Sequence, residues 1–436
     1  MKKLALHWQI LIGMAAGILA GYLFSRFDWG SDFVVAWIKP WGTIFINLLK
    51  LIAIPLIVAS LIKGVSDLDD IRQLSRLGTR TLGLYIMSTL IAVSLGLLVV
   101  NLVQPGSFIE EATRSDLMAS FGVSAEQNVG RANENQNKGP LSALVDVVPD
   151  NVIGAAASNG NMLQVIFFVV FFGIGLILIP AEKSEPVKRF FDGVNEVVLK
   201  MIDLIMLAAP YGVFALLAAL VVESPSPDVF KALGAYALTV VFGLAVLVFA
   251  FYPTLVKIFT NISYGDFFRG MAPAQLLAFS TSSSAATLPV TMERVEEHIG
   301  VDKDVVSFVL PVGATINMDG TSLYQAVAAV FIAQAFGDAL TIGQQLTIVL
   351  TATLASIGSA AVPGAGILML VIVLESIGVN PAGIALIFAV DRPLDMCRTV
   401  VNVTSDATVA ILVGKSLGKI TGPKVKDWDD HLVERS

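Results

Sequence analysis

Long apolar stretches are the feature that most constrains the fold of this chain. Six of them cover residues 5–25, 41–66, 80–104, 161–181, 194–222 and 231–257, and further apolar sequence continues to about residue 414. A helix needs about 20 apolar residues to cross a bilayer. The sequence therefore predicts an all-α polytopic membrane protein, with the lipid bilayer as a partner.

The composition agrees with this prediction. Of the 436 residues 55% are hydrophobic and 14% are charged, whereas soluble domains have about 25% charged residues. The net charge of −7 comes from acidic loops and the tail, and no basic cluster is dense enough to indicate nucleic acid as a partner. The single cysteine, Cys397, excludes an internal disulfide and a multi-thiolate metal site. His7, His298 and His431 are scattered along the chain and suggest no metal cluster.

Basic residues predict the orientation of the chain. Lys and Arg concentrate on the cytoplasmic side of membrane proteins. The basic residues near the expected spans all fall on one side: Lys2, Lys3, Arg72, Arg76, Arg80, Lys183, Lys188, Arg189, Lys257 and Arg269. Both termini are therefore expected in the cytoplasm. The first apolar segment is interpreted as a retained helix, and the polar segment 105–160 as an extracellular loop to which no site is assigned.

A charged face near the C-terminus carries most of the functional information. Asp391, Asp395, Arg398, Asn402 and Asp406 would fall within about 80° of arc on a helix. An ionisable side chain costs about 2.5–3.5 kcal/mol at the centre of a membrane helix. Such a cluster predicts a polar cavity that uses the charges. The alternative is a set of ion pairs that only hold helices together.

Two segments in the last third of the chain are interrupted by small residues. They cover 268–298 and 342–378, with breaks at 280–289 and 356–366, and they are interpreted as re-entrant hairpins, which are typical of transporter binding sites. Between them, residues 311–321 predict a helix unwound around Asn317 and Asp319. Exposed carbonyls beside a carboxylate and an amide are hard oxygen ligands that suit an alkali cation, with sodium the natural candidate.

Several strings in these segments match a known family. SSSAATLP, GATINMDGT, SIGSAAVPGAG, DRPLDMCRTVVNVTSDATVA and the shorter APYGVFALLA resemble the signatures of the glutamate transporter family, the dicarboxylate/amino acid:cation (sodium) symporters. The resemblance covers nearly the whole chain. It implies eight transmembrane helices plus two re-entrant helical hairpins in inverted repeats, a homotrimer, and an elevator-type transporter, not an enzyme, in a prokaryotic plasma (inner) membrane.

The resemblance also implies a division of the chain. The expected segments are scaffold helices 1 and 2 (1–79), transport-domain helix 3 (80–104), the extracellular polar loop (105–160), scaffold helices 4 and 5 (161–222), transport-domain helix 6 (223–267), hairpin 1 (268–300), helix 7 with its unwound NMDG (301–340), hairpin 2 (341–380), helix 8 (381–414) and a cytoplasmic tail (415–436).

By resemblance, two charged residues would select the substrate. Arg398 would hold a side-chain carboxylate with its guanidinium fork, and Asp395 would accept an ammonium, which together favour the acidic amino acids aspartate and glutamate. The remaining contacts would come from polar side chains and from the hairpin tips, namely Thr321, Thr399, Asn402, Ser283, Ser284, Val362 and Gly366. SSSAATLP has one residue more than the shortest family form, which leaves the serine contacts open.

The resemblance implies three sites for co-transported sodium. The first would use Gly313, Asn317, Asn402 and Asp406; the second Thr315, Ser356, Ile357 and Ser359; the third Tyr85, Ser88, Thr89, Asn317 and Asp319. Asp406 favours sodium coupling because proton-coupled members carry asparagine there. Gln325 after Tyr324 predicts no potassium dependence, because potassium-coupled members carry glutamate there.

Three other functions are considered. An ion channel fits the paired hairpins less well than alternating access does. An intramembrane aspartyl hydrolase would need paired aspartates that share a proton, whereas Arg398 should keep Asp391 and Asp395 ionised. A proton-coupled C4-dicarboxylate/glutamate symporter is the runner-up. Arg392, at the edge of the polar face, either modifies selectivity or pairs with an acid, and the sequence leaves both readings open.

Overall fold

The computed structural model describes residues 6–66, 75–111, 113–115, 148–157, 162–223, 227–357 and 364–423. These residues form helices and turns, and their only β pairing is an isolated bridge between Val301 and Ile420. The prediction of a helical fold is confirmed. Within these ranges four helical stretches are long and apolar enough to cross a membrane: Gly30–Lys63, Leu77–Phe108, Asp228–Phe259 and Val390–Ser416. The other apolar helices are shorter, so the expected eight spans stay a prediction.

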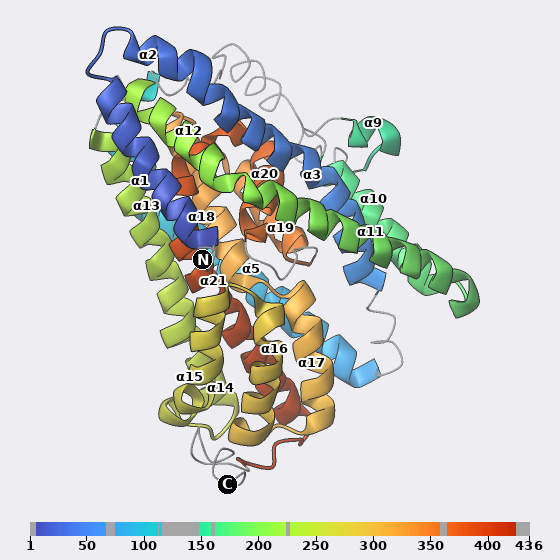
Figure 1. Ribbon diagram of the computed structural model, residues 1–436. Helices are drawn as coiled ribbons and strands as arrows, with labels where there is room; N and C mark the ends of the chain where they lie inside the picture. Colours follow the sequence, from blue (N-terminus) through green and yellow to red (C-terminus); the bar gives the residue numbers. More distant parts are fainter. Residues whose placement is uncertain are drawn as a thin grey trace, which may run out of the picture.

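The N-terminal half forms a layer of long helices over the rest of the molecule (Figure 1). Its elements are α1 (Leu6–Phe24), α2 (Gly30–Phe33), the π-helical turn Val34–Ile38, α3 (Lys39–Ser66), α5 (Ser75–Val103), α9 (Val152–Ala156), α10 (Met162–Leu178), α11 (Ala181–Leu207) and α12 (Ala209–Glu223). Helix α3 packs against α10, α11 and α12, whereas α5 leaves this layer to pack along α18 (Asp319–Ala335).

The apolar stretch 194–222 was expected to be one span, but it belongs to two helices. Helix α11 ends at Leu207 and α12 begins at Ala209. Pro210 lies in the first turn of α12, where its missing backbone N–H costs no hydrogen bond within the helix. The proline is thus compatible with the start of a new helix, which hydrophobicity alone does not reveal.

Helices α1 and α12 approach each other closely along a row of glycines. A Cβ atom built on Gly13, Gly17 or Gly21 would lie 2.4, 2.5 or 2.7 Å from a backbone carbonyl oxygen of α12. The three glycines are four residues apart, the spacing of small residues that lets two membrane helices pack backbone to backbone. Because the opposing atoms belong to the main chain, they cannot rotate away from a larger side chain.

We expect the substitution Gly17→Val to separate α1 from α12 and to destabilise the protein by about 1–3 kcal/mol or more. Thermal unfolding of the detergent-solubilised protein measures this. Gly83→Val is the matched control, since a Cβ on Gly83 would meet nothing within 4 Å. Equal unfolding temperatures for the two variants would contradict the assigned close contact.

The C-terminal half contains the shorter and interrupted helices. These are α13 (Pro227–Ala245), the π-helical turn Val246–Phe251, α14 (Tyr252–Phe259), α15 (Tyr264–Thr281), α16 (Ser284–Glu293), the π-helical turn Arg294–Ile299, α17 (Lys303–Ile316), α18, α19 (Ile342–Ile357), α20 (Ala365–Ser376) and α21 (Ile384–Ser416). Helix α21 lies at the centre of this half and packs against α13, α15, α17 and α18. Any side chain on its polar face is therefore enclosed by other helices.

The triple serine forms the tight turn between α15 and α16. Ser282 adopts a left-handed conformation with φ 52°, which ends α15. Ser283 then caps α16, because its side-chain oxygen accepts a hydrogen bond from the backbone N–H of Ala286 at 3.2 Å. The predicted break in residues 280–289 is confirmed.

The helix break predicted at residues 311–321 is also present. Helix α17 ends at Ile316, Asn317 is extended with φ −115° and ψ 100°, and α18 begins at Asp319. The second interrupted segment forms α19 and α20, and the residues between Ile357 and Gly364 lie outside the described ranges.

The segment that follows α21 is hydrogen-bonded to the start of α17. Lys419 Nζ donates to Asp302 Oδ1 at 3.1 Å and to Asp304 Oδ2 at 3.0 Å. These bonds, to Asp304 first and then to Asp302, raise the pKa of Lys419. The end of α21 is thereby joined to the start of α17.

Candidate functional site

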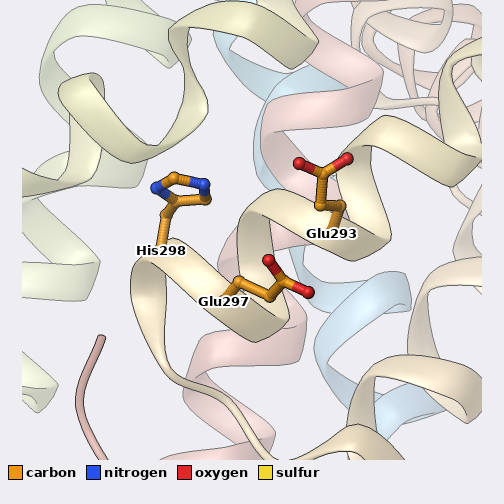
Figure 2. A group of neighbouring side chains, drawn as sticks. All are labelled: Glu293, Glu297 and His298. Carbon is orange, nitrogen blue, oxygen red and sulfur yellow. The ribbon is translucent and has the colours of Figure 1, made fainter. Parts of the chain in front are cut away.

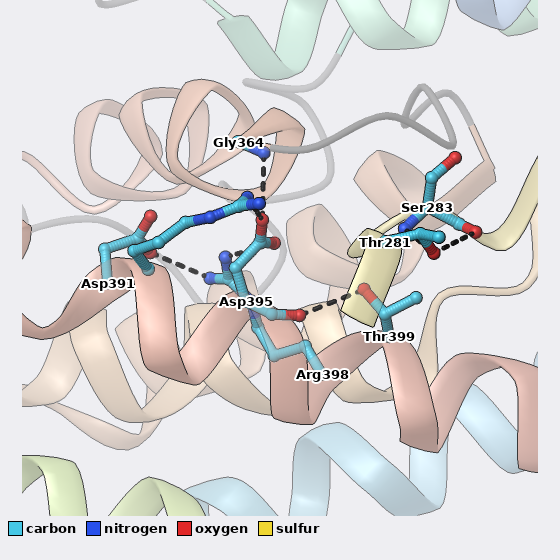
Figure 3. Close-up of polar contacts among 8 residues, drawn as sticks. Thr281, Ser283, Gly364, Asp391, Asp395, Arg398 and Thr399 are labelled. Carbon is cyan, nitrogen blue, oxygen red and sulfur yellow. Dashed lines mark hydrogen bonds and ion pairs between the residues drawn. The ribbon is translucent and has the colours of Figure 1, made fainter. Parts of the chain in front are cut away.

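Arg398 is the centre of the charged face on α21. Only 1% of its side chain is exposed, Nη2 donates to Asp395 Oδ1 at 2.7 Å, and Nη1 lies 3.1 Å from Asp391 Oδ1 (Figure 3). Its guanidinium carbon lies 3.8 Å from the centre of the Tyr324 ring on α18, a cation–π contact. Among the described residues, Nε and Nη1 of Arg398 make no hydrogen bond. The buried guanidinium therefore has donors that a carboxylate can accept.

Asp395 lies one turn before Arg398 and contacts more than that one residue. Its second carboxylate oxygen, Oδ2, accepts hydrogen bonds from Arg392 Nη1 at 3.0 Å and from the backbone N–H of Gly364 at 3.1 Å. Gly364 precedes α20, so this bond joins the second interrupted segment to α21 (Figure 3). The predicted charged face is thus enclosed on one side by that segment.

The start of α20 approaches the guanidinium very closely. A Cβ atom built on Gly366 would lie 3.1 Å from Arg398 Nη1 and 3.1 Å from Thr321 Cγ2. Gln325 Nε2 on α18 donates to the carbonyl of Gly366 at 3.3 Å. Gly366 is therefore placed beside Arg398 as the sequence predicts, whereas Val362 lies outside the described residues.

The remaining predicted substrate residues gather on α18, α21 and α16. Thr321 and Asn402 contact each other, with Asn402 Nδ2 donating to Thr321 Oγ1 at 3.3 Å. Thr399 is buried and donates to the backbone carbonyl of Asp395 at 2.9 Å. Ser283 and Ser284 lie at the start of α16, which packs against α21. The turn between α15 and α16, with Thr281 and Ser283, is drawn beside the charged face in Figure 3.

A second buried group contains two carboxylates at the helix break. Asp319 is fully buried, and its carboxylate accepts hydrogen bonds from Thr89 Oγ1 at 2.7 Å, Tyr252 Oη at 2.7 Å and Ser405 Oγ at 2.6 Å. Asp406, also buried, accepts from Asn317 Nδ2 at 2.9 Å. All these partners are neutral. Two carboxylates buried with neutral partners favour a cation nearby, because an uncompensated buried charge is costly.

Helix α5 contributes three of the five residues predicted for the third sodium site. Ser88 and Thr89 each have a hydroxyl 3.4 Å from Asn317 Oδ1, and Tyr85 donates to the backbone carbonyl of Val309 at 2.9 Å. The structure therefore brings residues from α5 together with Asn317 and Asp319, although more than 200 positions separate them in the sequence.

The predicted residues of the first two sodium sites are placed differently. A Cβ atom on Gly313 would lie 2.3 Å from Tyr85 Oη and 2.5 Å from Asp406 Oδ1, so Gly313 lies against the carboxylate. Ser356 Oγ accepts from the backbone N–H of Met318 at 2.8 Å, at the helix break. Thr315, in contrast, is exposed and donates to Val312 O at 2.9 Å. Ile357, the last residue of α19, is half-buried, and Ser359 lies outside the described residues.

The two groups are connected through α18 and α21. Asn402 Oδ1 accepts from the backbone N–H of Gly320 at 2.8 Å, at the first turn of α18. A Cβ atom on Gly320 would lie 2.5 Å from the carbonyl oxygen of Arg398. The start of α18 therefore lies against Arg398 and also forms one side of the helix break. It is the part of the main chain that the charged group and the carboxylate group share.

Sequence reasoning missed two residues of the carboxylate group. Tyr252 and Ser405 both donate to Asp319. Ser405 was detectable, because it directly precedes Asp406 on the polar helix. Tyr252 carried no clear signal, since a tyrosine at the end of an apolar stretch is also typical of a membrane interface.

A third cluster lies where α16 ends and the π-helical turn Arg294–Ile299 follows. Glu293, Glu297 and His298 have possible metal-ligating atoms within 4.8 Å of one another (Figure 2). The scattered histidines in the sequence had suggested no such group, although the four-residue spacing of the two glutamates places them on one helix face. His298 Nε2 also lies 2.7 Å from Arg294 Nη1. A guanidinium this close opposes a metal cation, so we assign the cluster no ligand.

An interrupted helix next to buried charges, in a helical protein with several apolar helices, is typical of membrane transporters. The class that fold and site define is therefore a polytopic transporter. The chain belongs to the sodium:dicarboxylate symporter family, which matches residues 6–416. This confirms the resemblance found in the sequence motifs.

Named relatives include transporters from bacteria and mammals. The chain is 36% identical to a proton/sodium-glutamate symport protein of Bacillus caldotenax over 438 residues, covering 100% of both chains. It is 36% identical to the proton/glutamate-aspartate symporter of Escherichia coli (strain K12), covering 99% of this chain and 97% of the relative. It is also 36% identical to excitatory amino acid transporter 3 of Mus musculus, covering 92% of this chain and 84% of the relative.

Proposed function

We propose that the protein is a sodium-coupled symporter that imports the acidic amino acids aspartate and glutamate. The observation that carries this proposal is the buried guanidinium of Arg398, whose Nε and Nη1 make no hydrogen bond among the described residues and lie near Asp395 and the glycines that begin α20. A guanidinium fork suits a carboxylate, and Asp395 suits an ammonium. An acidic amino acid carries both groups.

Sodium as the coupling ion is supported by the second buried group. Asp319 and Asp406 have only neutral hydrogen-bond partners among the described residues. Carboxylate, amide and carbonyl oxygens are hard ligands, which suit an alkali cation. The names of the relatives include both protons and sodium, so the coupling ion is part of the proposal.

Energetics favour coupling to more than one sodium ion. A tenfold sodium gradient supplies about 1.4 kcal/mol per ion, and a potential of about 100 mV adds about 2.3 kcal/mol per net charge moved. One sodium ion with a monoanionic substrate is electroneutral and gains nothing from the potential. Several oxygen-rich positions around the helix break make steeper accumulation feasible.

The rest of the proposal concerns assembly and movement. The protein would act as a homotrimer in a prokaryotic inner membrane, with both termini in the cytoplasm, eight spans and two re-entrant hairpins. Helix α5 and the C-terminal helices, which pack around α21, would move as an elevator against the N-terminal layer. Gln325 after Tyr324 supports transport without potassium.

Uptake of labelled aspartate into proteoliposomes tests the proposal. We expect uptake that needs an inward sodium gradient, is unaffected by internal potassium, and is inhibited by glutamate. Succinate should be included as a competitor without an amine. Uptake that a proton gradient drives in the absence of sodium would instead establish the proton-coupled symporter.

A further inference from the structure

The charged group on α21 contains a second basic residue, Arg392, beside Asp391, Asp395 and Arg398. The proposed function assigns no role to Arg392. It lies on α21 one turn before Asp395, and Nη1 donates to Asp395 Oδ2 at 3.0 Å. Of its side chain 18% is exposed, compared with 1% for Arg398. Arg392 therefore contacts the same carboxylate as Arg398 but from the more accessible side.

The carboxylate of Asp395 already has three donors. Arg398 occupies Oδ1, whereas Arg392 and the N–H of Gly364 share Oδ2. A carboxylate has about four acceptor positions, and an ammonium brings three donors. One acceptor position therefore remains, and an ammonium that donates more than one hydrogen bond to Asp395 must displace one of these donors.

Arg392 can leave Asp395 at a lower cost than Arg398. Its Nε is buried and makes no hydrogen bond among the described residues, and its guanidinium pairs with Asp395. Arg398 is fixed in addition by Asp391 and the ring of Tyr324. A long, partly exposed side chain can turn toward water, whereas a fully enclosed one cannot.

Local charge at Asp395 gives the exchange its direction. Asp391 and Asp395 carry two negative charges, and Arg392 and Arg398 carry two positive charges, so the group is neutral as it stands. An incoming ammonium brings another cation to Asp395 itself unless Arg392 moves away, whereas the carboxylates of an acidic amino acid bring their negative charge to the neighbouring Arg398. A ligand without an ammonium leaves the pair of Arg392 and Asp395 intact.

From these contacts we propose that Arg392 is a tethered competitor for the ammonium position on Asp395, and thereby a specificity-determining residue. It weakens the binding of amino acids, since they must displace it. It also permits amine-free dicarboxylates of the same length, since it neutralises Asp395 when no ammonium does. The inference rests on the proposed function. It adds the amine-free dicarboxylates, which Asp395 would reject if no cation neutralised it.

Calorimetric binding to the purified protein in saturating sodium tests the inference, with aspartate titrated directly and succinate as competitor. Arg392→Gln and Arg392→Met both remove the charge, and the second keeps an apolar stem if the first folds poorly. We expect aspartate to bind about tenfold more tightly and succinate at least about tenfold more weakly. Arg392→Lys should stay near the unmodified protein in both measurements.

The matched control is Arg189→Gln, which removes an exposed arginine paired to Glu185 at 2.9 Å on α11. It should leave both affinities unchanged. Parallel changes for aspartate and succinate, unchanged affinities in the Arg392 variants, or no competition by succinate in the unmodified protein would each overturn the inference. If the unmodified protein binds no acidic amino acid at all, the proposed function fails instead.

Discussion

Replacing Arg398 with cysteine is expected to reduce the affinity for aspartate by at least about 100-fold. Hydrogen bonds to charged groups contribute about 1.5–3 kcal/mol each, and a bidentate carboxylate contact includes two of them. The factor follows because about 1.4 kcal/mol corresponds to tenfold in affinity. Titration of aspartate into purified Arg398→Cys protein measures the loss, and neutral amino acids should be tested as replacement ligands.

The buried location of Arg398 requires a check on folding. Removing one partner of a buried ion pair can cost about 3–5 kcal/mol, because Asp391 and Asp395 would lose their shared cation. Arg398→Lys keeps a positive charge but lacks the planar fork, and we expect it to lose at least about tenfold in affinity. Arg189→Cys, on the exposed face of α11, controls for the new thiol. Undiminished aspartate affinity in folded Arg398→Cys would refute the role assigned to the guanidinium.

Replacing Asp406 with asparagine is expected to weaken sodium binding, so that aspartate binding needs a higher sodium concentration. Asn317 Nδ2 donates to Asp406 Oδ1 at 2.9 Å, and the amide oxygen of an asparagine can accept the same bond, so the local packing should persist. The negative charge that would attract a cation is lost. We expect the sodium concentration for half-maximal aspartate binding to rise at least about tenfold, which corresponds to about 1.4 kcal/mol.

Asp304→Asn is the matched control for this experiment, because Asp304 is an exposed carboxylate that contacts Lys419 near the start of α17. The control should keep the sodium dependence of the unmodified protein. An unchanged sodium requirement in Asp406→Asn would show that Asp406 does not participate in sodium binding.

The sequence alone predicted the elements whose signals are local. Helical periodicity placed the charges of residues 391–406 on one face, and α21 indeed buries Asp391, Asp395, Arg398, Asn402 and Asp406. Small residues and prolines predicted the breaks at Ser282 and Asn317, because such residues weaken a regular helix, although several of them, Pro289 and Pro311 included, lie inside the helices on either side. Both are consequences of the preferences of a few neighbouring residues.

Contacts between distant segments could not be predicted in the same way. Thr89 and Tyr252 reach Asp319 from other helices, 230 and 67 positions away. Which side chain meets which depends on how the helices pack, and hydrophobicity does not record that. Arg392 is the clearest example, since its place at the edge of the polar face left two readings open, and the contact with Asp395 shows the pairing from which the proposed role in specificity is inferred.

The break between α17 and α18 has an electrostatic consequence that depends on no side chain. The last carbonyls of α17 carry a partial negative charge, and the first amides of α18 carry a partial positive charge. Both helix ends meet at Asn317 and Met318, inside a region of low dielectric constant. One short stretch of main chain can thus favour a cation and an anion side by side. In the proposed function these are sodium and the acidic amino acid, whose binding would be coupled through the backbone.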